Sequence, residues 1–411
     1  MRVLWFTNTE SNYSKRSKGY NGGGWISSLE TQIRSIPAIQ LAVSFITSDM
    51  KAKDIQNMYY PIKNPYNKSV INKLKGIIAN REHKDEVLVS ECIKVIGKFK
   101  PDIIEVFGSE NSFGLICNST NIPVILHIQG IINPCFLSFL PPSYSLRSYL
   151  YHSLQPLVLY RERRGFDFFK YGAVREKTIL KSINYFFGRT EWDRRMTLLF
   201  NKNAKYYHCD EILRQEFYQE GNRSIPDKLV IISTISSPIY KGYDVILKTA
   251  RILKELCGVD FKWIVYGNVI RHRYLEKSVG VMPSDVNVIL SGVADAATLR
   301  ESLLGATCFV HPSYIDNSPN SVCEAQILGC PVISTNVGGI SSLIENGISG
   351  FLVPSNDPHQ MAYLIMQVYT NKSLNERIGR EGREKALYRH NEERIVKVVV
   401  DTYSEIVESK C

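Results

Sequence analysis

Short apolar runs alternate with longer amphipathic segments along the chain. In the first half, the apolar runs have the length of buried strands, and several of the segments between them have helical periodicity. Strands that alternate with helices form βαβ units, and near-continuous apolar strands fit a parallel sheet that is covered on both faces. We predict strands at Val3–Phe6, Leu41–Ile46, Ile103–Phe107, Val124–Ile128, Tyr185–Gly188 and Lys205–Cys209, and helical segments at Ile71–Ile78, Glu91–Phe99 and Val174–Ser182.

A second series of the same kind follows a polar stretch at Glu216–Asp227. Its predicted strands are Leu229–Ile232, Trp263–Tyr266, Val286–Leu290, Cys308–Val310, Val332–Ser334 and Phe351–Val353, and its predicted helices are Tyr243–Leu256, Ala296–Leu304, Ser321–Leu328 and Gln360–Tyr369. The two series predict an α/β protein with two doubly wound, Rossmann-like domains that face a cleft. Since open parallel sheets bind ligands at the carboxyl ends of their strands, this arrangement suggests an enzyme with two substrates.

The polar stretch also sets the predicted domain boundaries. We assign residues 1–215 to an N-terminal domain, 216–228 to a linker and 229–388 to a C-terminal domain. Residues 389–411 form a predicted terminal helix, with apolar residues at helical spacing over Asn391–Ser409. We expect this helix to pack back towards the N-terminal domain.

The charge of the chain is concentrated in its first half. The net charge is +10, and residues 1–228 alone carry +11. A basic half can serve nucleic acid, anionic lipid or a phosphorylated substrate, and it can also be an ordinary solvated surface. Residues 133–172 are rich in aromatic residues and end in a cluster at Arg161, Arg163 and Arg164. This segment fits a membrane interface, or an insertion packed on its own domain. No nucleic-acid-binding motif accompanies the charge, so we expect no nucleic-acid partner.

The sequence gives no sign of membrane insertion or of a metal site. No stretch of about 18 apolar residues occurs, and the initial run Val3–Phe6 is too short for a secretory signal. We expect a cytoplasmic protein, peripheral on the inner face of the membrane if the basic N-terminal domain binds there. The nine cysteines form no C-x-x-C pair, the histidines have no metal-ligand spacing, and Asp-x-Asp does not occur. We therefore expect no required metal.

The most informative stretch is Cys308–Ala325. An apolar strand ends near Val310, a polar loop follows, and a helix is expected to start near Ser318 or Pro319. Free N–H groups at such a helix start form an anion site. Asp316 and Glu324 are eight positions apart, close to two helical turns, so both carboxylates can face one cleft and bind paired hydroxyls. A helix-capping Asp316 with a surface Glu324 would fit the same spacing.

This stretch resembles the donor-binding signature of the retaining glycosyltransferase family 4, which has the two-domain GT-B fold. The resemblance covers Pro312-Ser313, the carboxylates Asp316 and Glu324, Gly329-Cys-Pro-Val332, Gly338-Gly339 and Gly350-Phe-Leu-Val-Pro354. Upstream, Lys241-Gly-Tyr-Asp-Val-Ile246 resembles a Lys-Gly element of the family. Phe187–Asp193 and Tyr206–Arg214 resemble a bacterial branch that is associated with surface polysaccharides.

The resemblance implies a role for each matched residue. Glu324 would bind the donor ribose, and Asp316 would contact the donor sugar. Lys241 would neutralise the leaving diphosphate, since charge-assisted contacts are strong. The turn amides of Asn317, Ser318 and Asn320 would contact sugar or phosphate, while Gly267, Gly292 and Val293 correspond to turns near the donor base.

Two departures from the family pattern stand out. The first carboxylate of the family is usually Glu, and Asp316 is one methylene shorter. An Arg that the family has shortly before the Lys is absent, because this chain reads Thr234-Ile-Ser-Ser-Pro-Ile-Tyr-Lys241. Arg271 or Arg273 is expected to replace it, or activity is weak.

Two features of the first half are further candidates. Asn21-Gly-Gly-Gly-Trp-Ile26 opens a predicted helix, and Gly23 and Gly24 would let a donor or acceptor approach the backbone. The same glycines also fit an ordinary strand–helix turn. His127 ends a predicted strand and resembles a family histidine near the reacting centre, although a lone histidine on an apolar strand is commonly a core residue.

These observations favour a retaining glycosyltransferase without a required cofactor. It would move a hexose from a UDP- or GDP-sugar to a glycan or lipid-linked oligosaccharide in capsule, O-antigen or exopolysaccharide synthesis, with Asp316, His127 and Lys241 as catalytic residues. The two departures favour a second reading, a catalytically weak sugar-nucleotide-binding protein. A third is a GT-B sugar-nucleotide epimerase, which would convert the donor without an acceptor. The sugar, the base, the linkage and the oligomeric state stay open.

Overall fold

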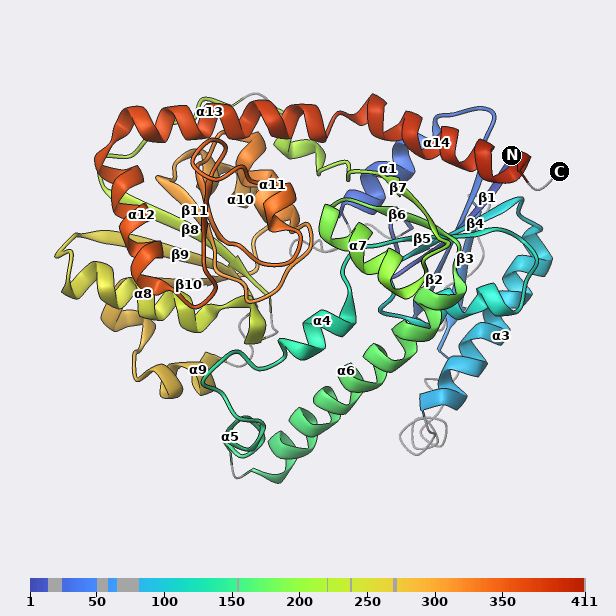
Figure 1. Cartoon of the computed structure of the whole chain (residues 1–411), viewed down its shortest axis with the longest axis horizontal. Helices are drawn as coiled ribbons and strands as arrows, with labels where there is room; N and C mark the ends of the chain where they lie inside the picture. The colour runs from blue at the N-terminus through green and yellow to red at the C-terminus, as the bar shows by residue number, and fades with distance from the viewer. Residues whose placement is uncertain are drawn as a thin grey trace.

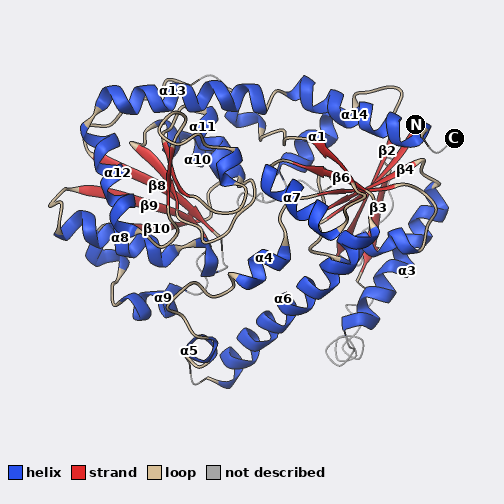
Figure 2. Cartoon of the chain, viewed as in Figure 1, coloured by secondary structure: helices blue, strands red, loops and turns tan. Residues whose placement is uncertain are grey.

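Two parallel sheets, each flanked by helices, make up the molecule (Figure 1). The computed structural model describes residues 1–13, 24–49, 58–64, 81–153, 155–219, 221–236, 239–268 and 272–409. Figure 2 shows the sheets as separate layers with helices packed around them. The predicted α/β class with two doubly wound units is confirmed.

The first sheet has seven strands in the order β3-β2-β1-β4-β5-β6-β7, and every adjacent pair is parallel. The order reverses between β1 and β4, which makes this the topological switch point of the sheet. The strands are β1 Arg2–Thr7, β2 Gln40–Thr47, β3 Tyr59–Lys63, β4 Ile103–Phe107, β5 Val124–His127, β6 Tyr185–Gly188 and β7 Lys205–His208.

The second sheet has six strands in the order β10-β9-β8-β11-β12-β13, again all parallel. Its switch point lies between β8 and β11, and both strands point their carboxyl ends toward the site described below. The strands are β8 Leu229–Ile235, β9 Phe261–Gly267, β10 Val288–Gly292, β11 Cys308–His311, β12 Val332–Thr335 and β13 Phe351–Val353.

The helices cover both faces of each sheet. The first domain has α1 Gly24–Arg34, α3 Arg81–Phe99, α4 Ile132–Leu137, α5 Leu146–Leu150, α6 Pro156–Ser182 and α7 Glu191–Phe200. The second has α8 Tyr243–Glu255, α9 His272–Val279, α10 Ala296–Leu304, α11 Asn320–Ile327, α12 Pro358–Thr370 and α13 Lys372–Arg389, before α14 Glu392–Glu408 ends the chain.

Each predicted strand overlaps an observed one. Most are buried runs, whereas β7 and β10, at the sheet edges, are largely exposed or half-buried. β3 was not predicted: it is short and contains Pro61, which suits an edge strand. The predicted helical segment Ile71–Ile78 lies outside the described residues.

Helix α14 returns from the second domain to the first. In Figure 1, α13 lies along the second domain and α14 continues over the first. Ile395, Val399 and Tyr403 are buried in the core of the first sheet. The indole nitrogen of Trp5 donates to the Tyr403 hydroxyl at 3.0 Å, which ties the last helix to the first strand. The domain boundaries given above stay predictions.

The aromatic segment within residues 133–172 packs on the second domain. The Tyr144 hydroxyl donates to Asp244 Oδ2 of α8 at 3.1 Å, and Tyr149 is fully buried with its ring 5.7 Å from that of Tyr274. The segment therefore does not pack on its own domain alone. The contact forms a bridge between the domains, made by α4, α5 and the start of α6.

Candidate active site

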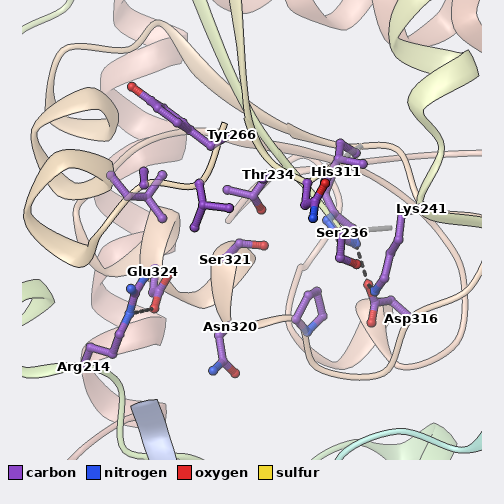
Figure 3. Close-up of a pocket in the computed structure, with 17 residues that line it drawn as sticks. Arg214, Thr234, Ser236, Lys241, Tyr266, His311, Asp316, Asn320, Ser321 and Glu324 are labelled. Atoms are coloured by element: carbon purple, nitrogen blue, oxygen red, sulfur yellow. Dashed lines mark hydrogen bonds and ion pairs between the residues drawn. The ribbon is translucent and has the colours of Figure 1, made fainter. Parts of the chain in front are cut away.

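A cavity of about 590 Å³ opens in the second domain at the carboxyl ends of β8, β9 and β11 (Figure 3). The start of helix α11 closes one side of it, and this helix begins directly after the polar loop that follows β11. Free N–H groups at the helix start therefore point toward the same region as the strand ends. The cavity is lined by Arg214, Thr234, Ile235, Ser236, Lys241, Tyr266, Gly267, Asn268, Val293, Ala294, Leu299, His311, Asp316, Pro319, Asn320, Ser321 and Glu324.

Asp316 lies at one end of the cavity, paired with Lys241. Lys241 Nζ is 2.6 Å from Asp316 Oδ2, and His311 Nε2 is 3.0 Å from the same oxygen. Burial alone would raise the pKa of Asp316, but Lys241 and His311 lower it well below its usual range. Asp316 is therefore an ionised carboxylate that neutralises a lysine inside the cavity.

Gly242 permits the Lys241–Asp316 contact. It has φ +81, and a Cβ there would be 2.1 Å from the carbonyl oxygen of Pro312. Any other residue would be strained and would push the turn away from the loop after β11. The glycine thus lets two strand-end segments approach closely enough for Lys241 to reach Asp316.

Glu324 lies at the other end of the cavity and is held by Arg214. The two guanidinium nitrogens Nε and Nη2 of Arg214 each donate to one carboxylate oxygen at 2.8 Å. This bidentate geometry is the strong form of an arginine–carboxylate pair. Burial raises the pKa of Glu324, and Arg214 offsets that rise only in part. Figure 3 shows the Arg214–Glu324 and Lys241–Asp316 pairs on opposite sides of the cavity.

Sequence reasoning missed Arg214. It stands 110 positions before its partner, in a segment that was assigned to the first domain. A salt bridge at that separation leaves no periodic or spacing signal. Only the resemblance at Tyr206–Arg214 pointed to this segment at all.

The turns expected near the donor base lie at the same cavity. Gly267 and Val293 line it, together with Asn320. Gly267 has φ +118, and a Cβ there would be 2.0 Å from the carbonyl oxygen of Ile235, so the end of β9 can lie against β8 only with glycine. Gly292, also with positive φ, ends β10 next to Val293 but is not among the lining residues.

Asn317 and Ser318 point their side chains at the first domain. Asn317 Oδ1 accepts from the Thr190 hydroxyl at 2.6 Å, and its Nδ2 donates to Asp193 Oδ2 at 2.9 Å. The Ser318 hydroxyl donates to Glu211 at 3.1 Å. Neither residue lines the cavity, so any donor contact would come from their backbone amides. That role stays a prediction.

The candidates of the first domain lie apart from the cavity lining. Gly23 lies outside the described residues, and Gly24 is buried at the start of α1. His127 is fully buried among the rings of Trp25, Phe107 and Phe187. Their proposed roles stay predictions.

A buried acid holds His127 in place. His127 Nδ1 is 2.7 Å from Glu105 Oε1, and Tyr403 donates to the other oxygen of Glu105. Burial raises the pKa of Glu105 to about 8, and burial together with the nearby Arg189 lowers that of His127. A protonated Glu105 donates to Nδ1, which leaves the ring proton on Nε2, an atom without a hydrogen-bond partner among the described residues.

The buried Glu105 gives a testable pH dependence. Its folded-state pKa is raised from 4.5, so its contribution to stability is full below that value and is lost as the pH rises through about 8. Glu105→Gln copies the protonated form. We expect the unfolding free energy of the wild type to fall relative to that of the variant between about pH 5 and pH 8. Urea denaturation of both proteins over this range measures the difference, and parallel curves would contradict the raised pKa.

Within the described residues, neither position expected to replace the missing family arginine does so. Arg271 lies outside these residues, and Arg273 is exposed and does not line the cavity. Lys241 and Arg214 supply the lysine and arginine side chains of the lining. The cavity thus has one cation near each carboxylate, a layout that fits a ligand with hydroxyl groups at both ends and anionic groups between.

Comparison with known proteins places this cavity in a family. Residues 214–385, which include the whole cavity lining, match the model of the glycosyl transferases group 1. This part of the chain is thus similar to the group 1 glycosyl transferases. The finer assignment to family 4 stays a prediction.

The relatives and structural neighbours of the chain are distant. The capsular polysaccharide biosynthesis glycosyltransferase CapM of Staphylococcus aureus is 29% identical over 147 residues, which cover 35% of this chain and 38% of CapM. An uncharacterized glycosyltransferase of Methanocaldococcus jannaschii is 22% identical, and the match spans 61% of that protein. The chain thus spans between about a third and two thirds of the length of these relatives.

The solved structures share the fold over the whole chain. Sucrose-phosphate synthase from Thermosynechococcus elongatus superposes with a TM-score of 0.74 at 14% identity, covering 99% of each chain. HepE of Anabaena, solved with UDP-glucose, superposes with a TM-score of 0.65 at 14% identity, covering 98% of this chain and 100% of that one. This likeness shows the fold: both sheets belong to one GT-B architecture.

Proposed function

We propose that this chain is a retaining hexosyltransferase that moves a sugar from a nucleotide-diphospho-sugar to a glycan or lipid-linked acceptor in the synthesis of a surface polysaccharide. The observation that carries the proposal is the pair of carboxylates at opposite ends of one cavity, each with its own cation. The group 1 match over the cavity and the name of CapM support it. UDP-glucose in HepE favours a UDP-sugar donor over a GDP-sugar.

The proposed mechanism assigns each end of the cavity a part of the donor. Glu324, oriented by Arg214, accepts hydrogen bonds from the ribose hydroxyls. Asp316 accepts a hydrogen bond from a hydroxyl group of the donor sugar. Lys241 Nζ, which is 2.6 Å from Asp316 Oδ2, lies at the same end of the cavity and binds the neighbouring diphosphate. The carboxylates thus fix the two ends of the donor, and its anionic middle lies near the start of α11.

In the transfer step, the acceptor hydroxyl oxygen bonds to the anomeric carbon as the bond from that carbon to the diphosphate oxygen breaks. The departing diphosphate takes the acceptor proton on the same face, so the configuration is retained and the charges balance. Lys241 and the helix start stabilise the negative charge that grows on the leaving group. NMR of the product tests the stereochemistry, and an inverted anomer would contradict this mechanism.

Donor binding is the first point to measure. A ligand at about 100 times its Kd stabilises a folded protein by about 2.7 kcal/mol. We expect the melting temperature to rise with UDP-sugars, or else with GDP-sugars, and this rise to disappear in Glu324→Ala. Glu345→Ala is a matched control, because Glu345 pairs with Lys385 on the surface of the same domain and does not line the cavity.

Each other outcome favours one of the alternatives. No shift with any nucleotide sugar would contradict donor binding. Binding without transfer to any acceptor would favour a catalytically weak binding protein. Conversion of the donor sugar in the absence of an acceptor would favour an epimerase.

We further propose that the start of α6 contacts the cytoplasmic face of an anionic membrane, where a lipid-linked acceptor would be available. Leu157 is 82% exposed and Phe168 is 56% exposed, and a cluster of basic residues lies between them on the same helix, at Arg161, Arg163 and Arg164. Apolar side chains flanked by basic ones suit the headgroup region. Among the helices of the described ranges, none has both the length and the apolar character needed to cross a bilayer.

Vesicle sedimentation tests this contact. Each basic residue near an anionic surface contributes about 1 kcal/mol, so replacing Arg161, Arg163 and Arg164 with Ser should weaken binding to phosphatidylglycerol vesicles by roughly 100-fold. The same triple change at Lys372, Arg377 and Arg380 on α13 should have little effect. Equal binding by both variants, or no preference of the wild type for anionic over neutral vesicles at low salt, would contradict the contact.

A further inference from the structure

A polar cluster lies at the switch point of the first sheet. Asn8 follows β1, Glu110 follows β4, and Gln129 follows β5, and these strands are neighbours in the sheet. Asn8 Nδ2 donates to Glu110 Oε2 at 3.0 Å, and Asn111 Nδ2 in turn donates to Asn8 Oδ1 at 2.5 Å. Open parallel sheets bind their ligands at this position, and the donor cavity of the second domain does not use it.

The backbone is built to bring the Glu110 carboxylate over the strand ends. Gly108 has φ +80, and a Cβ there would be 1.9 Å from Glu110 Oε2 and 2.9 Å from Asn8 Nδ2. A side chain at position 108 would therefore occupy the space that the carboxylate fills. Gly130 also leaves room, because a Cβ there would be 4.0 Å from Glu110 Oε1 and would meet nothing closer.

The cluster lies close to the reacting end of the donor cavity. The carbonyl oxygen of Gln129 accepts from Asn317 Nδ2 at 3.3 Å, and Asn317 directly follows Asp316. Tyr240, the neighbour of Lys241, has a pKa raised by burial and by the nearby charges of Asp316 and Glu110, among others. Glu110 and Asp316 therefore approach the same tyrosine from the first and the second domain.

The open atoms of the cluster match a hydroxyl group. Glu110 is partly exposed, and Asn8 donates to its Oε2, the oxygen on the side of β1. Gln129 Nε2 is buried and has no hydrogen-bond partner within the described ranges. A hydroxyl group both donates and accepts, so one acceptor oxygen and one donor nitrogen can satisfy it. Glu110 lies near Glu176 and near Arg175, but the charge of Arg175 is already paired with Asp85, so the carboxylates disfavour a phosphate at this point.

We propose that Asn8, Glu110 and Gln129 bind a hydroxyl group of the acceptor sugar, so that a neutral pyranoside is held beside the anomeric carbon of the donor. The proposal rests on the proposed glycosyltransferase function and names the site for its second substrate. Glu110 and Gln129 contact the hydroxyl, and Asn8 positions the carboxylate. The lipid phosphate of a lipid-linked acceptor would lie elsewhere, because Arg175, the cation next to the cluster, already donates to the Glu110 carbonyl oxygen and pairs with Asp85.

The test compares the wild type, Glu110→Ala and Glu110→Gln. Each is supplied with the nucleotide sugar that gives the wild type the largest rise in melting temperature. The probes are octyl glycosides with gluco, galacto, manno and N-acetylglucosamine headgroups. Binding is measured by saturation-transfer NMR in the presence of UDP, and transfer by mass spectrometry of the product. Losing the hydrogen bond to Glu110 should raise the acceptor Kd or KM about tenfold in Glu110→Ala, and Glu110→Gln should recover part of the loss.

Donor-side measurements separate an acceptor site from a structural role. The KM for the donor and its slow hydrolysis by water should change by less than about twofold in both variants, because neither involves the acceptor site. Glu91→Ala, which removes a surface pair with Lys94 on α3, is the control and should match the wild type.

Several outcomes would overturn the proposal. These are an acceptor KM within about twofold of wild type in Glu110→Ala, a parallel fall in donor hydrolysis, or no glycoside binding to the wild type. Failure of the proposed glycosyltransferase function gives a different result. The wild type itself would then show no rise in melting temperature with any nucleotide sugar, whatever the Glu110 variants do. Loss of that stabilisation in Glu324→Ala together with an unchanged Glu110→Ala would leave the function standing and remove only the acceptor site.

Discussion

Replacing Lys241 with Met is expected to reduce kcat by about 100- to 1,000-fold, the usual cost of removing one group that stabilises charge in a transition state. Met keeps the length of the side chain and removes the ammonium group that lies 2.6 Å from Asp316. The leaving diphosphate then departs against a carboxylate that keeps its contacts with His311 and the backbone N–H of Asn317 but has lost its lysine. The KM for the donor should change less than kcat, because the lost interaction strengthens as the bond breaks.

Steady-state release of the nucleotide measures both constants. Lys254→Met is the matched control: Lys254 lies on α8 of the same domain and binds the carbonyl oxygen of Asp285 at the surface. An unchanged kcat in Lys241→Met would contradict the role of Lys241 as the leaving-group cation. Arg214 would then be the remaining arginine of the cavity to test, with the expectation that Arg214→Met lowers donor affinity through Glu324.

The sequence predicted the parts of the structure that depend on neighbouring residues. The strands around Val3–Phe6 and Cys308–Val310 are apolar runs, and buried parallel strands need little more. The eight-residue spacing of Asp316 and Glu324 places both carboxylates on one cavity because a helix start lies between them. The group 1 match confirms the wider family that this stretch resembled.

Contacts between distant segments could not be predicted in this way. The pairing of Arg214 with Glu324 depends on how the two domains meet, and so does the packing of Tyr144 and Tyr149 on the second domain. Asn317 and Ser318 occur in the motif of the donor loop, and the motif does not show that their side chains bind the first domain. A motif identifies the loop, whereas only the fold determines which face of the loop each side chain occupies.

The donor loop is therefore shared between the domains. Asp316 and Asn320 face the cavity, while Asn317 and Ser318 bind Thr190, Asp193 and Glu211 of the other domain. Any motion that separates the domains must break these contacts and release the loop that carries Asp316. The geometry of the donor site thus depends on side chains that do not line it.

Glu211 is at the centre of these contacts. Its Oε2 is 3.2 Å from Arg189 Nε, and both side chains are at most 2% exposed. It also accepts from Ser318, and lies beside Cys323 and His390 in a fully buried group. Burial would raise the pKa of Glu211, but Arg189 and His390 lower it below its ordinary value. The ionised carboxylate therefore neutralises Arg189 at the junction of the domains.

We expect Glu211→Ala to destabilise the protein by about 3–5 kcal/mol, because removing one partner of a buried ion pair leaves an uncompensated charge. Arg189 would retain its position 4.1 Å above the Trp25 ring but lose its carboxylate. Chemical denaturation of the wild type, Glu211→Ala and the surface control Glu345→Ala measures the effect, and the control should change little. Because the folded-state pKa of Glu211 is depressed, the deficit of Glu211→Ala should be full above the ordinary carboxyl pKa and shrink as the pH falls below it. A deficit no larger than that of Glu345→Ala would show that water reaches Arg189 when the carboxylate is absent. The domain junction would then be held by the Asn317 contacts instead.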